Sequence, residues 1–480
     1  MSADRYDNPL VSRYASTEMS ALFSARTKFG TWRRLWLVLA EAEKELGLAI
    51  PDEALADLRA HLVPTDEELA AADQYERQTK HDVMAHVHAL GDAAPAARGI
   101  VHLGATSAFV GDNADILVVR DALALLERRS ARVLAALAAF ARAHRDLPCT
   151  GFTHFQAAQP TTVGKRACLW LQDLSLDHRE LVRRREELRF LGCKGATGTE
   201  ASFVALFDGD KEKAARLDRL VTEKAGFAHR FLIAGQTYTR KQDALVLSAL
   251  SGLAASAAKF ANDLRLLQHM KEVEEPFGAS QVGSSAMPYK RNPMKCERIN
   301  SLARWLLTTA ENGHWTHAHQ WFERTLDDSA NRRLALAESF LTADAILLLW
   351  DAVVSGLVVN REVIARRLRD ELPFLATENL LMAAARKGGD RQVLHERIRV
   401  LAQAAGNRLK AQGGENTLLA DVAADPAFRL TPKDVAAATD SALFVGRAPE
   451  QVDEFLATEI APILAAHPEA LAGAAEEVRV

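Results

Sequence analysis

The chain has 480 residues, of which 48% are hydrophobic, 25% are charged and 6% are aromatic, and its formal net charge is −4. At roughly 150 residues per domain, this length predicts about three domains, and the balance of apolar and charged residues is that of an ordinary globular protein. A chain with this slightly negative net charge lacks the overall excess of basic residues by which proteins bind nucleic acid or an anionic membrane. An anionic ligand would therefore need positive charges gathered locally at its site.

The N-terminal residues 1–14 carry charged side chains and no apolar core, so they do not predict a signal peptide. The cysteines are widely spaced and form no C-x-x-C pair, which is typical of a reducing compartment rather than of a zinc knuckle or a disulfide framework. No uninterrupted apolar run is long enough to span a bilayer. We therefore expect a cytoplasmic protein that associates with neither nucleic acid nor a membrane.

Helices are favoured along most of the chain, because alanine and leucine dominate its apolar residues. An early apolar stripe at helical spacing comprises Trp32, Leu35, Trp36, Leu39 and Ala40. Three later stretches, 112–144, 239–275 and 326–355, contain at most one glycine and no proline. They predict helices far longer than the usual mean of about 11–12 residues. Such lengths indicate a bundle whose apolar faces also pack against partner chains, whereas a solenoid would show a repeat that is absent here.

Helix breakers cluster between the long stretches, at residues 99–111, 148–164 and 276–293. Loops at the ends of rigid helices often carry functional groups, and the third cluster is long for a connection without a role. After residue 359 the pattern changes to shorter segments broken by proline and glycine. We therefore predict an all-α fold with an N-terminal helical domain, a central long-helix bundle and a C-terminal helical domain. Their predicted ranges are 1–106, 107–359 and 360–480.

The most informative segment is Gly283-Ser-Ser-Ala-Met-Pro-Tyr-Lys-Arg-Asn-Pro293. It places two hydroxyls, a cation and an amide on a flexible backbone, a set that suits a carboxylate ligand and a closing lid. A solvated surface loop is the plain alternative for a segment rich in serine and glycine. The order of the residues resembles the signature loop of the fumarase/aspartase superfamily, G-S-S-x-x-M-P-x-K-x-N with one residue fewer or more before the methionine.

Further motifs narrow the resemblance to adenylosuccinate lyases, especially their animal-type branch, from about residue 5 into the C-terminal domain. These motifs are Ser12-Arg-Tyr-Ala-Ser16, Lys80-His-Asp-Val-Met-Ala-His-Val-His88, His102-Leu-Gly-Ala-Thr-Ser107, Gly151-Phe-Thr-His-Phe-Gln156, Lys194-Gly-Ala-Thr-Gly-Thr199, Gly235-Gln-Thr-Tyr238 and the segment 321–333. Lys80 stands where arginine is usual and Ala157 where proline is usual. Neither departure removes a group that is expected to transfer a proton.

The resemblance implies a β-elimination, in which a base removes a proton beside a carboxylate of a succinyl group and an acid protonates the departing nitrogen. It implies Ser284 as the base and His154 as the acid, although residue types alone would favour a histidine base. Lys290 is the candidate cation that would stabilise the serine alkoxide. Glu297 would orient His154, and His81 would lie near the phosphate and the reacting centre. For each histidine, a structural role is the alternative.

The same resemblance implies a set of substrate-binding residues. They are Arg13, Tyr14, Lys80, His81, Asp82, Thr106, Ser107, Gln236, Asn292, Arg298, Arg324, Ser329 and Arg333. The spacing of the last ones is informative by itself, because Thr325-Leu-Asp-Asp328 is typical of a helix capping box and Ser329 and Arg333 lie one turn apart beyond it. That start of a helix could bind a phosphate, or it could be an ordinary salt-bridged terminus.

Two histidine clusters, at 81–88 and 314–319, lack the i, i+4 pair of helical zinc sites, so we predict neither a metal nor an organic cofactor. The resemblance implies a homotetramer with active sites shared between chains. Its substrates would be adenylosuccinate and succinylaminoimidazole-carboxamide ribotide of purine biosynthesis, both of which yield fumarate. Two alternatives stay open: another superfamily lyase, such as argininosuccinate lyase or fumarase, and a structural protein recruited from a lyase.

Overall fold

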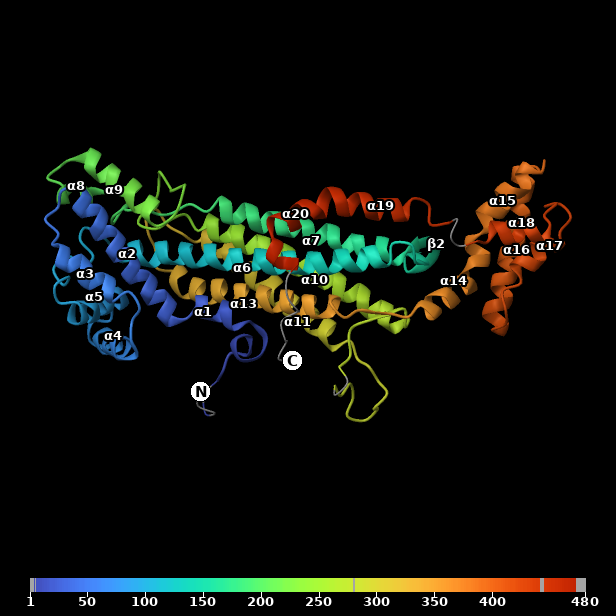
Figure 1. Cartoon of the computed structure of the whole chain (residues 1–480), viewed down its shortest axis with the longest axis horizontal. Helices are drawn as coiled ribbons and strands as arrows, with labels where there is room; N and C mark the ends of the chain where they lie inside the picture. Colours follow the sequence, from blue (N-terminus) through green and yellow to red (C-terminus); the bar gives the residue numbers. More distant parts are fainter. Residues whose placement is uncertain (1–3, 5, 279–280, 441–443, 472–480) are drawn as a thin grey trace.

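The structure, a computed structural model, describes residues 4, 6–278, 281–440 and 444–471. An elongated bundle of long helices runs through its middle, with smaller groups of helices at its two ends (Figure 1). Strands make up only four short segments of the described residues. The predicted all-α fold is confirmed.

Five long helices form the central bundle. They are α6 (Ser107–Ala143), α7 (Val163–Glu186), α10 (Lys241–His269), α11 (Met294–Ala310) and α13 (Asp328–Val354). Helix α6 packs against α7 and α13, while α10 packs against α7, α11 and α13. The 37 residues of α6 span about 55 Å at 1.5 Å per residue, so this helix alone sets the length of the bundle.

Helix α10 is long and apolar enough to cross a membrane by length and composition alone. Charged residues interrupt its sequence, Lys259 and Asp263 among them, so the expectation that the chain holds no uninterrupted apolar run of spanning length is not contradicted. More than half of its most apolar 18-residue stretch is buried inside the fold. Its apolar residues serve the core of the bundle, where a helix is hydrophobic around most of its circumference.

Shorter helices cover one end of the bundle (Figure 1). They are η1 (Leu10–Tyr14), α1 (Thr17–Leu22), α2 (Ala25–Glu45), α3 (Asp52–Ala60), α4 (Asp66–Thr79), α5 (Asp82–Ala93), α8 (Ala201–Leu206), α9 (Lys211–Lys224) and, beside α10 and α13, α12 (Asn312–Ala318). The apolar stripe of α2 is buried as its spacing predicts, with Trp32 and Trp36 almost inaccessible to solvent. These residues belong to the same continuous core as the long helices.

The breaker cluster at 148–164 forms a β-hairpin between α6 and α7 instead of an irregular loop. Strands β1 (Pro148–Thr153) and β2 (Gln156–Thr162) are antiparallel, and Thr153 pairs with Gln156. The turn therefore consists of His154 and Phe155 alone, with φ angles of 51° and 57°. A two-residue hairpin turn of this type needs positive φ at both positions, which bulky residues adopt only with strain.

A second apolar core lies at the other end of the molecule, among the helices that follow β4 (Val358–Val359), the partner of β3 (Val273–Glu274). Those helices are α14 (Arg361–Leu375), α15 (Thr377–Arg386), α16 (Arg391–Gln412), α17 (Leu418–Ala424) and α18 (Pro432–Ala438).

The last elements then return to the bundle, where α19 (Ala448–Phe455) packs against α7 and is followed by η3 (Leu456–Ile460), α20 (Ala461–Ala466) and η4 (Pro468–Leu471). Residues 452–463 contribute side chains to the core of the bundle. The single C-terminal domain expected over 360–480 stays a prediction. The boundaries at 106 and 359 stay predictions. Of the expected domains, residues 1–3, 5, 279–280, 441–443 and 472–480 lie outside the described residues.

Candidate active site

Most of the predicted catalytic residues and several predicted binding residues fall into two groups at opposite ends of the bundle. Helix α6 begins at Ser107, and the hairpin that carries His154 follows its last residue. Helix α10 ends where the segment leading to the signature loop begins, and Trp170 near the start of α7 donates to Asp263 near the end of α10 (2.8 Å). The signature loop is therefore rooted at the same end as the hairpin (Figure 1). We call the two regions the Ser107 end and the hairpin end.

At the Ser107 end, predicted residues from three segments form one polar cluster. His81 is the N-cap of α5, and its Nδ1 accepts from the backbone N–H of Met84 at 3.3 Å. Its Nε2 lies 3.3 Å from Oγ of Ser107. Because an accepting Nδ1 leaves the proton of a neutral ring on Nε2, the ring donates to the serine. Asp82 pairs with Arg333 of α13 at 3.0 Å.

One further cation of this region, Lys28 on α2, belongs to none of the sequence motifs. Its Nζ lies 5.2 Å from the ring centre of Phe29 and 5.1 Å from that of Trp32. Burial lowers the pKa of Lys28, and the neighbouring Arg333 lowers it further, while Asp82 is among the carboxylates that oppose the shift. The only signal in the sequence was a lysine beside an apolar helical stripe, which is usually a solvated residue.

A second network ties the start of α13 to the bundle and corrects one prediction. Asp328 is buried, and it accepts from Nε of Arg240 (2.6 Å) and from Nη1 of Arg324 (2.9 Å). Arg240 also donates twice to Asp112 of α6. The capping box expected at Thr325 is therefore wrong, because α13 begins at Asp328 and this carboxylate binds arginines instead of capping a helix. The phosphate contact assigned to Arg324 stays a prediction, and its guanidinium already has this partner.

A cavity of about 250 Å³ lies beside this network, between residues 233–240 and 317–324. The backbone N–H of Gln236 joins the two segments by donating to the carbonyl of Glu323 (2.9 Å). Arg240 and Arg324 line the cavity together with Phe322, whose side chain is fully exposed. Gln236 itself is not among the lining residues, and its predicted substrate contact stays a prediction.

At the hairpin end, the signature loop is folded tightly around its catalytic candidate. Oγ of Ser284 accepts from the backbone N–H groups of Ala286 (3.3 Å) and Met287 (3.1 Å). Nδ2 of Asn292 donates to the carbonyl of Gly283 at 2.7 Å. A Cβ on Gly283 would lie 2.1 Å from the carbonyl oxygen of Lys290, so only glycine fits there. The backbone amides of Ala286 and Met287 are donors of the kind that stabilise a serine alkoxide.

The other candidates at this end face solvent. His154, Lys290 and Glu297 are exposed. Within the described part of the chain, no hydrogen bond or ion pair joins His154 to Ser284 or to Glu297. The roles of these residues therefore stay predictions.

The remaining predicted contacts are scattered. Arg13 lies in η1 with its guanidinium carbon 6.0 Å from the ring centre of Tyr14. Lys80 ends α4 in the left-handed conformation, and Thr106 is the N-cap of α6. Ser329 and Arg333 lie one turn apart on α13, while Arg298 is half-buried on α11. Their substrate contacts also stay predictions.

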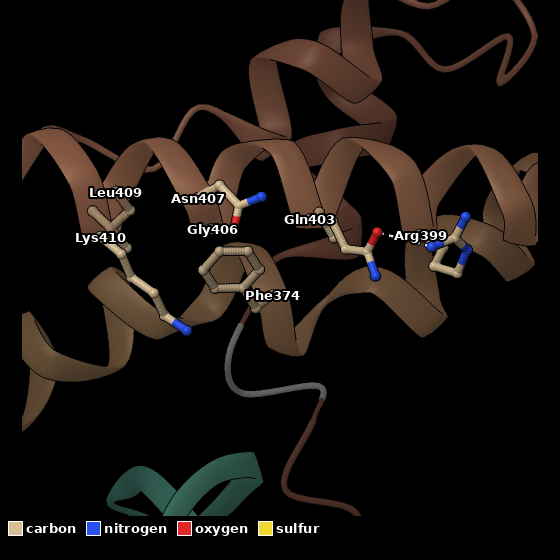
Figure 2. A pocket seen from close by; sticks show the side chains of 8 residues that line it. Phe374, Arg399, Gln403, Gly406, Asn407, Leu409 and Lys410 are labelled. Carbon is tan, nitrogen blue, oxygen red and sulfur yellow. Dashed lines mark hydrogen bonds between the residues drawn. The ribbon is translucent and has the colours of Figure 1, made fainter.

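Two further features lie outside these groups. A groove of about 450 Å³ runs along α16 beside Phe374, with Arg399, Gln403, Asn407 and Lys410 on its rim (Figure 2). None of the predicted site residues lines it. Among the described residues, no three or more His, Cys, Asp or Glu side chains are grouped so that they could hold a metal ion.

Known proteins match the chain along nearly its whole length. The family described as "Lyase" matches residues 15–306, and the family described as "Adenylosuccinate lyase C-terminus" matches residues 373–455. Adenylosuccinate lyase of Saccharomyces cerevisiae is 52% identical over 458 residues, 95% of each chain. The Schizosaccharomyces pombe enzyme of that name is 50% identical over 461 residues, 96% of each chain.

Solved structures agree with the sequence matches. A fumarate lyase from Mesorhizobium sp. BNC1 superposes with a TM-score of 0.80 at 26% identity, covering 95% of this chain and 100% of the other. A 3-carboxy-cis,cis-muconate lactonizing enzyme from Pseudomonas putida gives a TM-score of 0.82 at 24% identity, covering 97% of this chain and 100% of the other, which shows a shared fold alone. The chain belongs to the adenylosuccinate lyase family of the fumarase/aspartase superfamily.

Proposed function

We propose that this chain is an adenylosuccinate lyase that releases fumarate from adenylosuccinate, leaving AMP, and from succinylaminoimidazole-carboxamide ribotide. Identity of 50–52% to two such lyases over at least 95% of the chain supports this most directly. In the reaction, a base takes the proton beside a succinyl carboxylate, and the electrons of that C–H bond form the double bond of fumarate. The C–N bond breaks, and an acid protonates the nitrogen.

The hairpin end supplies the proton-transferring groups in this proposal. Ser284 acts as the base, because its Oγ already accepts two loop amides that would also stabilise an alkoxide. His154 acts as the acid from the tip of its hairpin, and Lys290 holds a substrate carboxylate. Glu297 orients the acid histidine.

The Ser107 end binds the nucleotide in this proposal. Three helices, α5, α6 and α13, start close together there, and helix N-termini favour anions. Arg333 and Lys28 add positive charge, while His81 and Ser107 add hydrogen-bonding groups. A phosphate-bearing substrate therefore fits this end better than argininosuccinate does.

The two ends meet only if chains associate, and we propose a homotetramer whose active sites combine residues of different subunits. A helix of about 55 Å separates Ser107 from the hairpin within one chain. Large apolar side chains on the long helices are exposed, and such patches mark protein interfaces. They include Leu169, Leu176, Leu245, Leu266 and Trp305.

A spectroscopic turnover assay tests the proposed function. The purified chain is expected to release fumarate from both succinylated nucleotides and none from argininosuccinate. Absence of fumarate from both nucleotides would refute the proposal, and turnover of argininosuccinate would support the other superfamily lyase instead. Native mass spectrometry should find four chains per particle, and a monomer would contradict the shared site.

We also propose that the enzyme works in the cytoplasm. The four cysteines are free and buried, and burial raises the pKa of the Cys149 and Cys168 thiols to about 11. Unpaired thiols are typical of a reducing compartment. Cell fractionation with an antibody checks this, and recovery in a membrane or secreted fraction would contradict it.

A further inference from the structure

The signature loop leaves the bundle through an acidic segment, Lys271-Glu-Val-Glu-Glu-Pro276, to which the mechanism assigns no role. Glu272 and Glu275 in this segment are only 1% and 3% exposed. Burying a carboxylate is costly unless hydrogen-bond donors or cations satisfy it. The partners of these glutamates therefore indicate what the segment does.

Glu275 reaches across the base of the loop to the helix where the loop ends. Its Oε1 accepts from the backbone N–H of Lys295 (3.1 Å) and its Oε2 from that of Cys296 (3.0 Å). Both amides belong to the first turn of α11, whose N-cap, Pro293, provides no side-chain acceptor. A carboxylate is well placed there, because it satisfies free amides at the positive end of the helix.

Further hydrogen bonds close the same base. Oε1 of Gln268, near the end of α10, accepts from the backbone N–H of Glu275 (3.1 Å). Its Nε2 donates to the carbonyl of Arg291 (3.0 Å). Nζ of Lys295 donates to the carbonyl of Pro276 (3.2 Å). These hydrogen bonds therefore connect the segment that leads into the signature loop with the segment that follows it.

The other two glutamates tie the segment to the C-terminal helices. Glu272 forms an ion pair with Arg367 of α14 at 2.8 Å. Oε1 of Glu274 accepts from Asn360, just before α14, at 2.9 Å. The base of the loop is therefore held from two directions, and of the three glutamates in this segment Glu275 is the one whose carboxylate spans the loop itself.

We propose that Glu275 is a positioning residue for the elimination reaction. By capping α11 from the opposite side of the loop, its carboxylate fixes the two loop ends relative to each other. It thereby holds Ser284 on the loop and Glu297 on α11 in one rigid unit. We call this connection of the two loop ends through Glu275 the clamp. Its effect on catalysis rests on the proposed function, whereas the clamp itself does not.

The variant Glu275→Gln tests the proposal, because it keeps the size of the side chain but removes its charge and one of its two acceptors. Loss of charged hydrogen bonds of this kind should lower kcat between about tenfold and a hundredfold. KM and the affinity for AMP should stay within about twofold of the unsubstituted enzyme, since the Ser107 end is untouched. Hydrogen exchange of the amides at 283–296 should become faster.

Asp390→Asn is the matched control. Asp390 also caps a helix through two backbone amides, those of Gln392 (2.8 Å) and Val393 (3.1 Å), but it is the N-cap of α16, away from the loop. This variant should leave kcat unchanged. An equal loss of kcat in both variants would overturn the proposal, because it would indicate a general effect of stability.

A milder variant, Gln268→Met, tests the clamp if Glu275→Gln does not fold. It removes the bridge to Arg291 and should lower kcat about threefold to tenfold at constant KM. Unchanged kcat together with unchanged exchange at 283–296 would overturn the clamp. If the unsubstituted enzyme shows no lyase activity, the proposed function fails, and the exchange measurement alone still tests the clamp.

Discussion

The Ser107 end and the hairpin end of the bundle present their polar groups in opposite ways. At the Ser107 end, His81 contacts Ser107 and Asp82 pairs with Arg333, so the side chains hold one another in place. At the hairpin end, His154 is exposed at the tip of a strained turn. The side chains at the Ser107 end contact one another within one chain, whereas His154 at the hairpin end faces solvent and forms no hydrogen bond to Ser284 within the described residues. Under the proposed function, this difference predicts that His154 completes a site together with residues of another chain.

The largest expected effect is that of Ser284→Ala at the hairpin end. Loss of a general base costs about 10²- to 10⁴-fold in kcat. The affinity for AMP should change little, because the nucleotide would bind at the other end. Steady-state kinetics and calorimetric titration with AMP check both parts. If the purified variant keeps more than a tenth of the activity, Ser284 is not the base.

A smaller effect of the opposite kind is expected from Arg333→Ala at the Ser107 end. Removing a charged partner of the nucleotide should raise KM about tenfold, while kcat changes less than about threefold. Arg397→Ala is the matched control, because Arg397 is likewise an exposed arginine paired with an aspartate, Asp425 at 2.9 Å. A fall in kcat at constant KM would indicate that Arg333 acts in proton transfer. It would contradict the assignment of nucleotide binding to the Ser107 end.

The long helices were predictable because their cause is local. The stretch 326–355 lacks breakers, and the observed helix, Asp328–Val354, differs from it by a residue or two at each end. The helix predicted from 112 starts earlier, at Ser107, because a single glycine, Gly111, does not end a helix. Periodicity and breakers thus located the bundle but not its exact ends.

Features that depend on distant partners could not be predicted. Asp328 was interpreted as part of a capping box, yet its buried carboxylate binds Arg240, 88 residues away. The hairpin could not be predicted because His154 and Phe155 are unusual residues for a turn with positive φ. Motifs identified the candidate residues, while their division between two ends required the fold.

The smallest effect on activity is expected from Glu43→Gln, a change outside both groups. Glu43 on α2 is fully buried, its carboxylate has no hydrogen-bond partner among the described residues, and burial raises its pKa to about 8. The folded chain thus keeps this proton up to about pH 8, whereas an unfolded carboxyl loses it near pH 4.5. The free energy of unfolding therefore falls as pH rises from about 5 to 8.

Glutamine is neutral at every pH, so Glu43→Gln should remove this fall in the free energy of unfolding with rising pH. Relative to the unsubstituted enzyme, its thermal midpoint should increase progressively between pH 5 and pH 8, with kcat unchanged. Calorimetry across this range checks the prediction. A difference in midpoint that is independent of pH would show that the carboxyl does not carry the proton.

Mixing two inactive variants tests the central claim most directly, namely that the two ends meet only between chains. Chains with His81→Ala and chains with His154→Ala are dissociated mildly and reassembled in equal amounts. Each site then draws its two histidines from different chains, and about a quarter of the sites receive both intact. Activity near a quarter of that of the unsubstituted enzyme is predicted. Activity that stays at background, with mixed tetramers confirmed by mass, would contradict the claim.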